Sequence, residues 1–368
     1  MSTYNDDDRV KLAWAEVFPL IALTLLGVRF VQGFIFWGGA SRRLIYDFHE
    51  VAGVDLAVKL DFEAAGFVAA KLVHALPGAL WVQGPIEWTL AHPALVDASV
   101  WAWTFAELAV GLGLIFGLFT RLLALASVGL NIALMMIFGW MGSTCLDEWT
   151  MAVSGLAMSA AVVIAGGGGL SLDRLLMGRA TQMGRRSWLT WLTSGTLHPV
   201  AMRRLAMAFA AIAAIFTVGT YDILFGAVVS PLHSRVDFHR HAIALSDVTL
   251  SNDGAVVFEA YVDAGPDTGA AYVIAASLED ASGNVIERWD GESLAGLAQS
   301  AIVNAWPYAW ASKFKTEVIG FSAQTGARAT ITLAPPRDGL ALASGGYKLT
   351  LEAIDGTAWS ATVTLQNG

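Results

Sequence analysis

Residues 100–119 read VWAWTFAELAVGLGLIFGLF, an apolar stretch with a single charged residue, Glu107. At a rise of about 1.5 Å per residue, a helix of this length crosses a hydrocarbon core about 30 Å thick. Four more apolar stretches have a similar length, and they cover residues 18–38, 122–140, 149–170 and 205–226. The sequence therefore predicts a multi-pass α-helical membrane protein, in which four helices form a bundle and a fifth span follows.

The composition of the whole chain agrees with a membrane location. Hydrophobic residues make up 55% and charged residues 14% of the 368 residues, and the mean hydropathy is +0.56. An ordinary soluble domain has about 25% charged residues. The net charge of −9 leaves no basic face of the kind that nucleic acids require. We therefore expect the lipid bilayer, and no nucleic acid, among the partners of this protein.

Basic residues indicate how the spans are oriented. The segment between the fourth and fifth apolar stretches is rich in arginine, and its basic residues are Arg174, Arg179, Arg185, Arg186, Arg203 and Arg204. Such segments face the cytoplasm in most membrane proteins. With five spans, the N-terminus then lies in the cytoplasm, and residues 231–368 lie outside the cytoplasmic membrane. The expected parts are a membrane bundle, a cytoplasmic linker, a fifth helix and an outer domain, at residues 1–173, 174–204, 205–226 and 231–368.

The outer domain has the pattern of an all-β, Ig-like sandwich. Short runs rich in β-branched and aromatic residues alternate with turn sequences such as Asp280-Ala-Ser-Gly283 and Asp355-Gly356. The expected strands cover residues 255–262, 272–278, 285–289, 329–333, 347–354 and 358–365.

Two histidines of the outer domain are weak candidates for a metal site. His239 and His241 would share one face of a strand, and His233 is near in the sequence. A zinc site needs at least three protein ligands, and the sequence offers no evident third one. We therefore predict no metal, and histidines that meet water or lipid head groups are the simpler interpretation.

Ionisable residues inside the predicted spans suggest a polar layer. Arg29 lies in the first span and Glu107 in the second, and such residues are costly in lipid unless they are paired. Counted from the expected outer ends of their spans, both lie roughly 10–13 Å deep, so we expect them to pair. Asn131, Ser154 and Ser159 lie at a similar depth. This layer is either a latch that holds the bundle or the floor of a site for a quinone head group or an anion.

The outward turn between the third and fourth spans contains the only cysteine of the chain. It reads Gly142-Ser-Thr-Cys145-Leu-Asp147-Glu148-Trp149, and Thr144 and Asp147 have the spacing of a helix-capping box. Cys145 would then lie in the first helical turn, where the helix dipole favours the reactive thiolate. Asp147 and Glu148 oppose this effect. A buried, unreactive cysteine is the alternative, and a single cysteine excludes an intramolecular disulfide.

These residues resemble a known family. The pattern Glu107-Leu-x-x-Gly111-Leu-x-Leu-x-x-Gly117-x-x-Thr120-Arg121 resembles the second and third helices of the DoxX/DoxD membrane family, and the turn at residues 142–149 resembles the DoxD branch. Gly265-Pro-Asp-Thr-Gly269, Ile302-Val-Asn304 and Gly346-Tyr347 are similar to DoxA. The resemblance implies a fused thiosulfate:quinone oxidoreductase. Such an enzyme oxidises two thiosulfates to tetrathionate and passes two electrons to membrane quinone.

The resemblance assigns no catalytic residue, so the candidates rest on their chemistry. Cys145 would hold a sulfane sulfur, and Glu107 and Arg29 would lie near the quinone, with the carboxylate taking part in proton transfer. Arg42 and Arg43 follow the first span and would attract the thiosulfate dianion. Contact with lipid phosphates is an equally good interpretation of these two arginines.

The sequence carries no haem, flavin, nicotinamide or iron–sulfur motif. We therefore expect no bound cofactor, with membrane quinone as the electron acceptor and a terminal quinol oxidase as a partner through the quinone pool. The lack of a redox motif also keeps two other functions open. One is a membrane adaptor that presents the β domain to a redox or sulfur-handling partner, and the other is an anion permease.

Overall fold

The computed structural model describes residues 6–44, 49–51, 54–56, 65–79, 81–138, 146–177, 188–225, 242–264, 271–309, 312–335 and 342–365. The chain forms two compact units. One contains Met1–Phe62, Ala98–Gly139 and Asp147–His233, and the other contains Glu63–Asp97, Trp140–Leu146 and Ser234–Gly368. The expected boundaries of the four parts stay a prediction.

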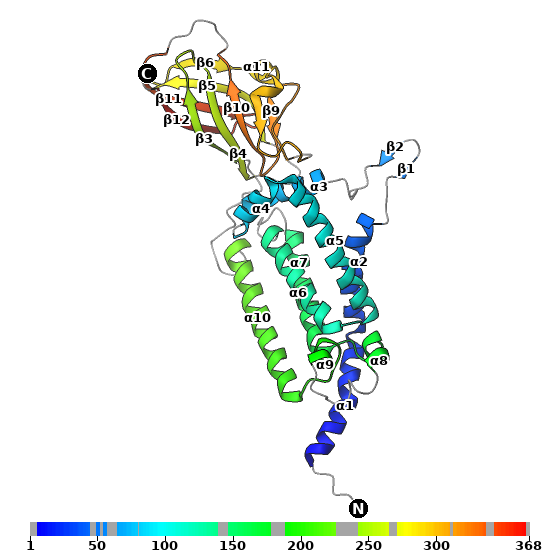
Figure 1. The fold of residues 1–368 in the computed structure, drawn as a ribbon. Helices are drawn as coiled ribbons and strands as arrows, with labels where there is room; N and C mark the ends of the chain where they lie inside the picture. Colours follow the sequence, from blue (N-terminus) through cyan, green and yellow to red (C-terminus); the bar gives the residue numbers. More distant parts are fainter. Residues whose placement is uncertain are drawn as a thin grey trace, which may run out of the picture. The chain divides into compact units, whose positions relative to one another are not determined.

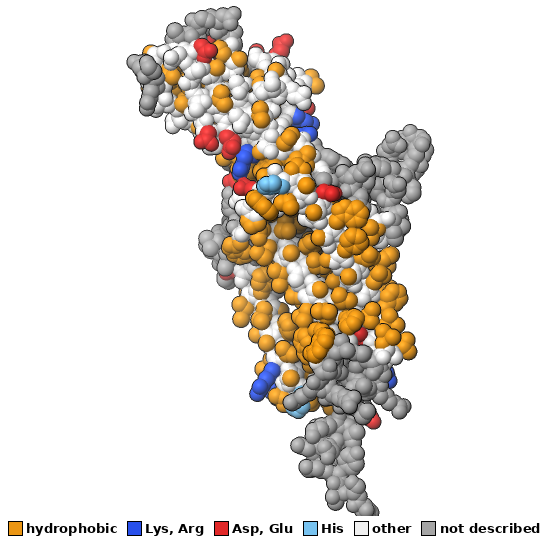
Figure 2. Space-filling view, in the orientation of Figure 1, with side chains coloured by type: hydrophobic (Ala, Val, Ile, Leu, Met, Phe, Trp, Pro, Cys, Tyr) orange, Lys and Arg blue, Asp and Glu red, His pale blue; other side chains and the backbone are white. Residues whose placement is uncertain are grey.

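The first unit is helical (Figure 1). It contains all or most of each long helix, and these are α1 (Asp6–Thr24), α2 (Leu26–Leu44), α5 (Pro93–Phe116), α6 (Thr120–Phe138), α7 (Leu146–Ala165) and α10 (Pro199–Phe225). The short helices α8 (Leu172–Met177) and α9 (Trp188–Leu192) follow α7, and the strands β1 (His49–Val51) and β2 (Val54–Leu56) pair with each other. Hydrophobic side chains cover much of the visible surface of these helices, as a lipid environment requires (Figure 2).

Helices of membrane-spanning length confirm the prediction of a multi-pass membrane protein. Among the described residues, Pro93–Phe116, Thr120–Phe138 and Pro199–Thr220 are long and apolar enough to cross a bilayer. Glu16–Thr24 and Leu26–Ser41 together form a fourth candidate, which is bent by 49°. The Thr24 hydroxyl donates to the Ile21 carbonyl (2.6 Å) just before this break, a bond that often bends helices. Trp149–Ala165 is a shorter apolar helix.

Two glycines bring α2 and α5 into close contact. A Cβ at Gly33 would lie 2.8 Å from the Ile115 nitrogen, and a Cβ at Gly111 would lie 2.6 Å from the Trp37 nitrogen. Neither neighbouring atom can move without moving its helix, so any larger residue would separate the two helices. Small residues play this part in many membrane bundles.

The second unit contains a β sandwich, which confirms the predicted fold class. One sheet has the order β3-β4-β10-β7, and the other has the order β12-β11-β5-β9-β8 with β6 also paired to β5. The strands are β3 (Ala242–Leu250), β4 (Val256–Ala264), β5 (Ala271–Asp280), β6 (Val285–Trp289), β7 (Ile302–Asn304), β8 (Lys315–Thr316), β9 (Phe321–Ala323), β10 (Arg328–Leu333), β11 (Gly345–Ala353) and β12 (Ala358–Leu365). Phe258, Leu278, Ile331 and Leu349 are fully buried in the shared core.

A helical segment from the first half of the chain belongs to this second unit. It contains α3 (Ala65–Ala75), one 3₁₀ turn (Leu76–Gly78) and α4 (Gln83–Leu90). The sandwich itself carries the short helix α11 (Gly291–Ala295) and a 3₁₀ turn (Gln299–Ala301). Sequence position alone therefore does not decide to which unit a segment belongs.

Candidate functional site

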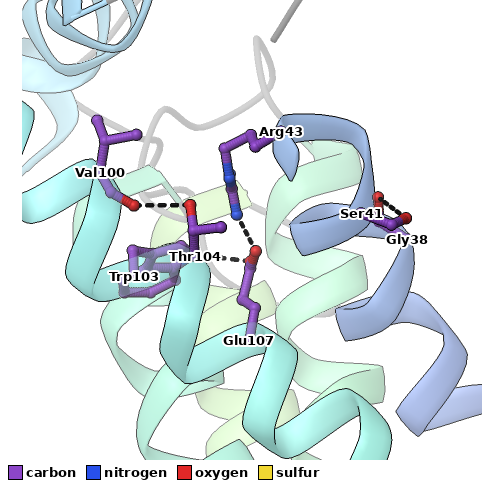
Figure 3. A network of polar contacts seen from close by, with 7 residues as sticks. All are labelled: Gly38, Ser41, Arg43, Val100, Trp103, Thr104 and Glu107. Carbon is purple, nitrogen blue, oxygen red and sulfur yellow. Dashed lines mark hydrogen bonds and ion pairs between the residues drawn. The ribbon is translucent and has the colours of Figure 1, made fainter. Parts of the chain in front are cut away.

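Glu107 is the centre of a polar cluster on α5 (Figure 3). Its carboxylate is 8% exposed, Oε2 is paired with the Arg43 guanidinium, and Oε1 accepts a hydrogen bond from Trp103 Nε1 (2.7 Å). Trp103 lies four residues before Glu107, so the indole and the carboxylate share one face of the helix. The described partners of this buried acid thus include a cationic and a neutral side chain.

Helix α2 provides the space as well as the cation for this cluster. A Cβ at Gly39 would lie 2.8 Å from Glu107 Oε2, so the absence of a side chain there lets the carboxylate approach α2. Arg43 is one helical turn further along, where its guanidinium reaches the same carboxylate. The hydroxyls of Thr104 and Ser41 donate instead to carbonyls of their own helices, at Val100 and Gly38 (Figure 3).

The expected pair of Arg29 with Glu107 is wrong. Arg29 is 4% exposed and donates to the carbonyl oxygens of Gly167 and Leu170, the latter at 2.8 Å. It lies beside Gly117, where a Cβ would be 2.6 Å from Arg29 Nη1. Gly117 is ten residues beyond Glu107, or about 15 Å along a helix.

The error came from the assumption that the outer ends of the two spans lie at one level. In the structure, Glu107 lies against Gly39 of α2, ten residues after Arg29, and α2 continues beyond Gly38 to Leu44. The extension of α2 brings Arg43 to Glu107. The sequence analysis had named both residues, but for separate roles.

Asp173 is the centre of a second polar cluster, near Gly117. One carboxylate oxygen accepts from the Phe119 N–H (2.7 Å), and the other accepts from the Thr120 N–H (3.0 Å). The hydroxyls of Thr120 and Ser194 also donate to this second oxygen, each at 2.7 Å. Asp173 therefore satisfies free N–H groups at the start of α6, as a capping residue would. The sequence analysis missed this role, because the donors are distant in the chain.

Arg121 lies close to this second cluster and is 1% exposed. Its Nε donates to the Val163 carbonyl (2.9 Å) and its Nη1 to the Trp191 carbonyl (3.3 Å). The sequence analysis gave Arg121 no role beyond its place in the family pattern. Its contacts link α6 with α7 and α9.

Between the two clusters, the predicted polar layer is present with partly different members. Gln32 Nε2 donates to the hydroxyls of Ser127 (2.9 Å) and Ser159 (3.1 Å), which lie 2.6 Å apart. Asn131 Nδ2 donates to the Ser127 carbonyl (2.8 Å). Asn131 and Ser159 were predicted correctly, whereas Ser154, which was also predicted, is exposed. Gln32 and Ser127 were missed, although Gln32 is a polar residue one turn after Arg29.

Several sequence candidates lie outside the described residues. These are Cys145 and the three histidines His233, His239 and His241, together with the side chain of Arg42. Within the described part of the chain, no group of three or more His, Cys, Asp or Glu residues has an arrangement that could hold a metal ion.

Comparison with known proteins shows to which families the two parts of the chain belong. Residues 25–200 match the family described as "TQO small subunit DoxD", and residues 225–362 match "TQO small subunit DoxA". A solved structure titled "Structure of Iho670 Flagellar-like Filament" is 9% identical with a TM-score of 0.21, over 45% of this chain and 98% of that one. That likeness is too slight to support an argument. The chain belongs to the DoxD family through its helical part and to the DoxA family through its β part, joined in that order.

Proposed function

We propose that this chain is a membrane-bound enzyme that oxidises two thiosulfates to tetrathionate and reduces membrane quinone. Both matched families are subunits of TQO, thiosulfate:quinone oxidoreductase, an oxidoreductase that acts on sulfur donors and is linked to quinone. The observation that carries the proposal is the presence of both subunit types in one chain, in order. The quinol would then be reoxidised by a terminal oxidase through the quinone pool.

The proposed reaction balances without another reactant. Two thiosulfate dianions each lose one electron, and a new S–S bond joins their sulfane sulfurs to give tetrathionate. The quinone takes up the two electrons and two protons and becomes quinol. The protein must therefore attract two anions, bring their electrons to a quinone and supply protons.

Glu107 is the residue that we assign to proton transfer. It is buried close to one end of α2, and its partners Arg43 and Trp103 are side chains, which can rearrange when a ligand binds. A positioned carboxylate that exchanges a proton typically accelerates a reaction by about 10²–10⁴-fold. Arg29 is bound to two backbone carbonyls, so we assign it to the support of the bundle.

Cys145 would provide a covalent route for the sulfur chemistry. Its thiolate and a thiosulfate would form a Cys–S–S–SO₃⁻ adduct, and the two electrons released would pass to the quinone. The sulfane sulfur of a second thiosulfate would then attack the sulfane sulfur of the adduct, giving tetrathionate and the free thiolate. Arg42 and Arg43 would attract both dianions. Because Arg43 is paired with Glu107, its charge is partly compensated before substrate binds.

We place this chemistry at the outer face of the cytoplasmic membrane. The arginines at residues 174–204 support a cytoplasmic location for that segment, which puts the N-terminus inside and the β domain outside. Glu107 and Arg43 then belong to the outer half of the bundle, on the same side as the turn that contains Cys145. Protease protection of the β domain in sealed, right-side-out vesicles would contradict this orientation.

The test is anaerobic quinone reduction by the purified, detergent-solubilised chain after addition of thiosulfate, with tetrathionate measured in the same sample. One tetrathionate per quinol is expected. The variant Cys145→Ser should abolish turnover if the covalent route operates, and full turnover would remove the thiol intermediate. A folded wild-type protein that reduces no quinone would contradict the proposal, and uptake of labelled thiosulfate into vesicles by that protein would indicate a permease.

A further inference from the structure

The segment that contains α3, the 3₁₀ turn and α4, residues 65–90, lies within the DoxD match but folds with the β sandwich. We call it the docking hairpin. The sandwich belongs to the DoxA match, so this unit joins parts of two families. The contacts within the unit show how closely the two parts fit.

The first contact is between backbones. Gly326 has a φ of +83°, and a Cβ at this position would lie 1.8 Å from the carbonyl oxygen of Val73 on α3. Only a glycine permits both this conformation and this approach. Beside it, the Ser312 hydroxyl donates to the Ala70 carbonyl on the same helix (3.0 Å). The loop before β10 is thus shaped to receive α3.

The second contact is polar and involves α4. Arg328 on β10 forms an ion pair with Glu87 (3.1 Å), and its guanidinium lies over the rings of Tyr261 and Trp306, 4.8 and 5.6 Å from their centroids. The Tyr308 hydroxyl donates to the Leu90 carbonyl at the end of α4 (2.7 Å). Arginine held between aromatic rings and tyrosine with a bonded hydroxyl are typical anchors of stable protein interfaces.

Apolar side chains of the docking hairpin are also buried. Ala69, Val73 and Leu76 are fully buried, and Leu90 is 1% exposed. Two helices of 11 and 8 residues are too short to be stable by themselves. The hairpin therefore depends on the unit with which it folds.

We propose that the docking hairpin is the binding site of the membrane part for a DoxA-type sandwich, and that it holds this domain without the covalent connection between residues 225 and 242. The hairpin continues directly into the membrane helices, since α5 begins at Pro93. A cut in the connection therefore leaves the hairpin on the membrane fragment. The same surface would hold a DoxA-type sandwich that is a separate chain.

The experiment uses the full chain with an N-terminal affinity tag and a protease site inserted between residues 226 and 241. After cleavage in detergent, the immobilised membrane fragment should retain the β fragment through extended washing. The double variant Val73→Arg/Glu87→Arg puts a charge into the buried face and repels Arg328, so its retention should fall roughly tenfold or more. The variant Tyr308→Phe removes one hydrogen bond and should release the β fragment severalfold faster.

A matched control separates the interface from charge effects in general. Glu292→Arg makes the same charge change as Glu87→Arg, but on the sandwich at an exposed position on α11, and should retain the β fragment like the wild type. Release of the wild-type β fragment upon cleavage would overturn the proposal. Undiminished retention by the double variant would overturn it as well, because another surface would then hold the domain.

Discussion

Asp173 and Glu107 are both buried acids of the helical unit, but their surroundings differ. The carboxylate of Asp173 accepts hydrogen bonds from two backbone N–H groups and the Thr120 hydroxyl at the start of α6, and from the Ser194 hydroxyl after α9. Glu107 is bound to an arginine and an indole. Two of the four donors to Asp173 belong to the backbone and cannot change rotamer, whereas the described donors to Glu107 are both side chains that can.

This difference distinguishes an acid that supports the fold, Asp173, from an acid that is available for the reaction, Glu107. Phe119, one of the donors to Asp173, has a φ of +46°, an unfavourable conformation for a bulky residue that needs outside support. Asp173 supplies this support and is therefore expected to serve the fold. Glu107 lies on a regular helix that does not need it, and its described partners are side chains that a bound ligand can displace.

The largest effect on stability is expected for Asp173→Asn. The amide group would turn an N–H toward donors and leave them unsatisfied, which should lower the free energy of unfolding by roughly 2–4 kcal/mol. The apparent melting temperature in detergent is the measurement. Asp97→Asn, at an exposed position on α5, is the control and should melt like the wild type. If Asp173→Asn melted at the same temperature as the wild type, the proposed role of Asp173 in supporting the fold would be wrong.

A smaller loss is expected for Gly155→Ala, which disturbs the polar layer between the two clusters. The new Cβ would lie 2.2 Å from Asn131 Oδ1 and would displace this side chain, at a cost of about 1–3 kcal/mol. Gly129→Ala on α6 is the matched control, because no atom lies within 4 Å of its Cβ position. Alanine is the better helix former, so this control should keep or slightly raise the melting temperature. Equal melting of both variants would contradict this packing.

Arg43 tests the other cluster through the reaction more than through stability. Its side chain is 15% exposed and Glu107 stays buried, so Arg43→Gln should cost about 2 kcal/mol in stability. The catalytic rate should fall by roughly tenfold, because Glu107 loses its cation. Arg43→Lys keeps the charge and should recover part of this loss. The measurement is the rate of quinone reduction by the wild type, Arg43→Gln and Arg43→Lys. Equal rates for the three proteins would exclude Arg43 from the reaction.

The smallest effect concerns Asp280, a partly exposed acid that, like Asp173, accepts hydrogen bonds from backbone N–H groups and a side chain. Hydrogen bonds from the side chain and backbone of Asn284 and from the Ser282 N–H hold the pKa of Asp280 below its ordinary value of 3.8. The ionised form is thus the one that the turn stabilises. The stability that these hydrogen bonds contribute is fully present above the pKa of the unfolded state. It is lost as the pH falls through the lower pKa of the folded state.

Hydrogen exchange of the β5–β6 amides measures this effect. Acidification below about pH 4 should loosen the wild-type turn, whereas Asp280→Asn should differ from the wild type above this range and approach it at lower pH. A constant difference between the two proteins across the whole range would contradict the assigned pKa.

Local patterns were sufficient to predict most of the sandwich. The expected strands at residues 285–289 and 358–365 coincide with β6 and β12. Strands β7, β8 and β9 have only two or three residues, too few for an alternating pattern. Strand β3 was missed for a different reason. Asp247, with a φ of +51°, interrupts its register between Ser246 and Thr249 and breaks the alternation.

The polar clusters were predicted less well, because they depend on the ends of helices and on distant segments. Asn131 and Ser159 could be placed at one depth, and they do belong to one layer. The pairing of Glu107 with Arg43 requires the final turn of α2, which the apolar pattern does not include. Asp173 was given no role, because its first donor, the Phe119 N–H, lies 54 residues earlier in the chain.

The most direct test of the account is the rate of thiosulfate-dependent quinone reduction by Glu107→Gln, measured together with its melting temperature. Glutamine keeps the shape of the side chain but carries no exchangeable acid proton. The account predicts a melting temperature close to that of the wild type. It also predicts that the rate falls by a factor of about 10² or more. A rate equal to that of the wild type in a folded protein would contradict the account and make Glu107, like Asp173, a structural residue.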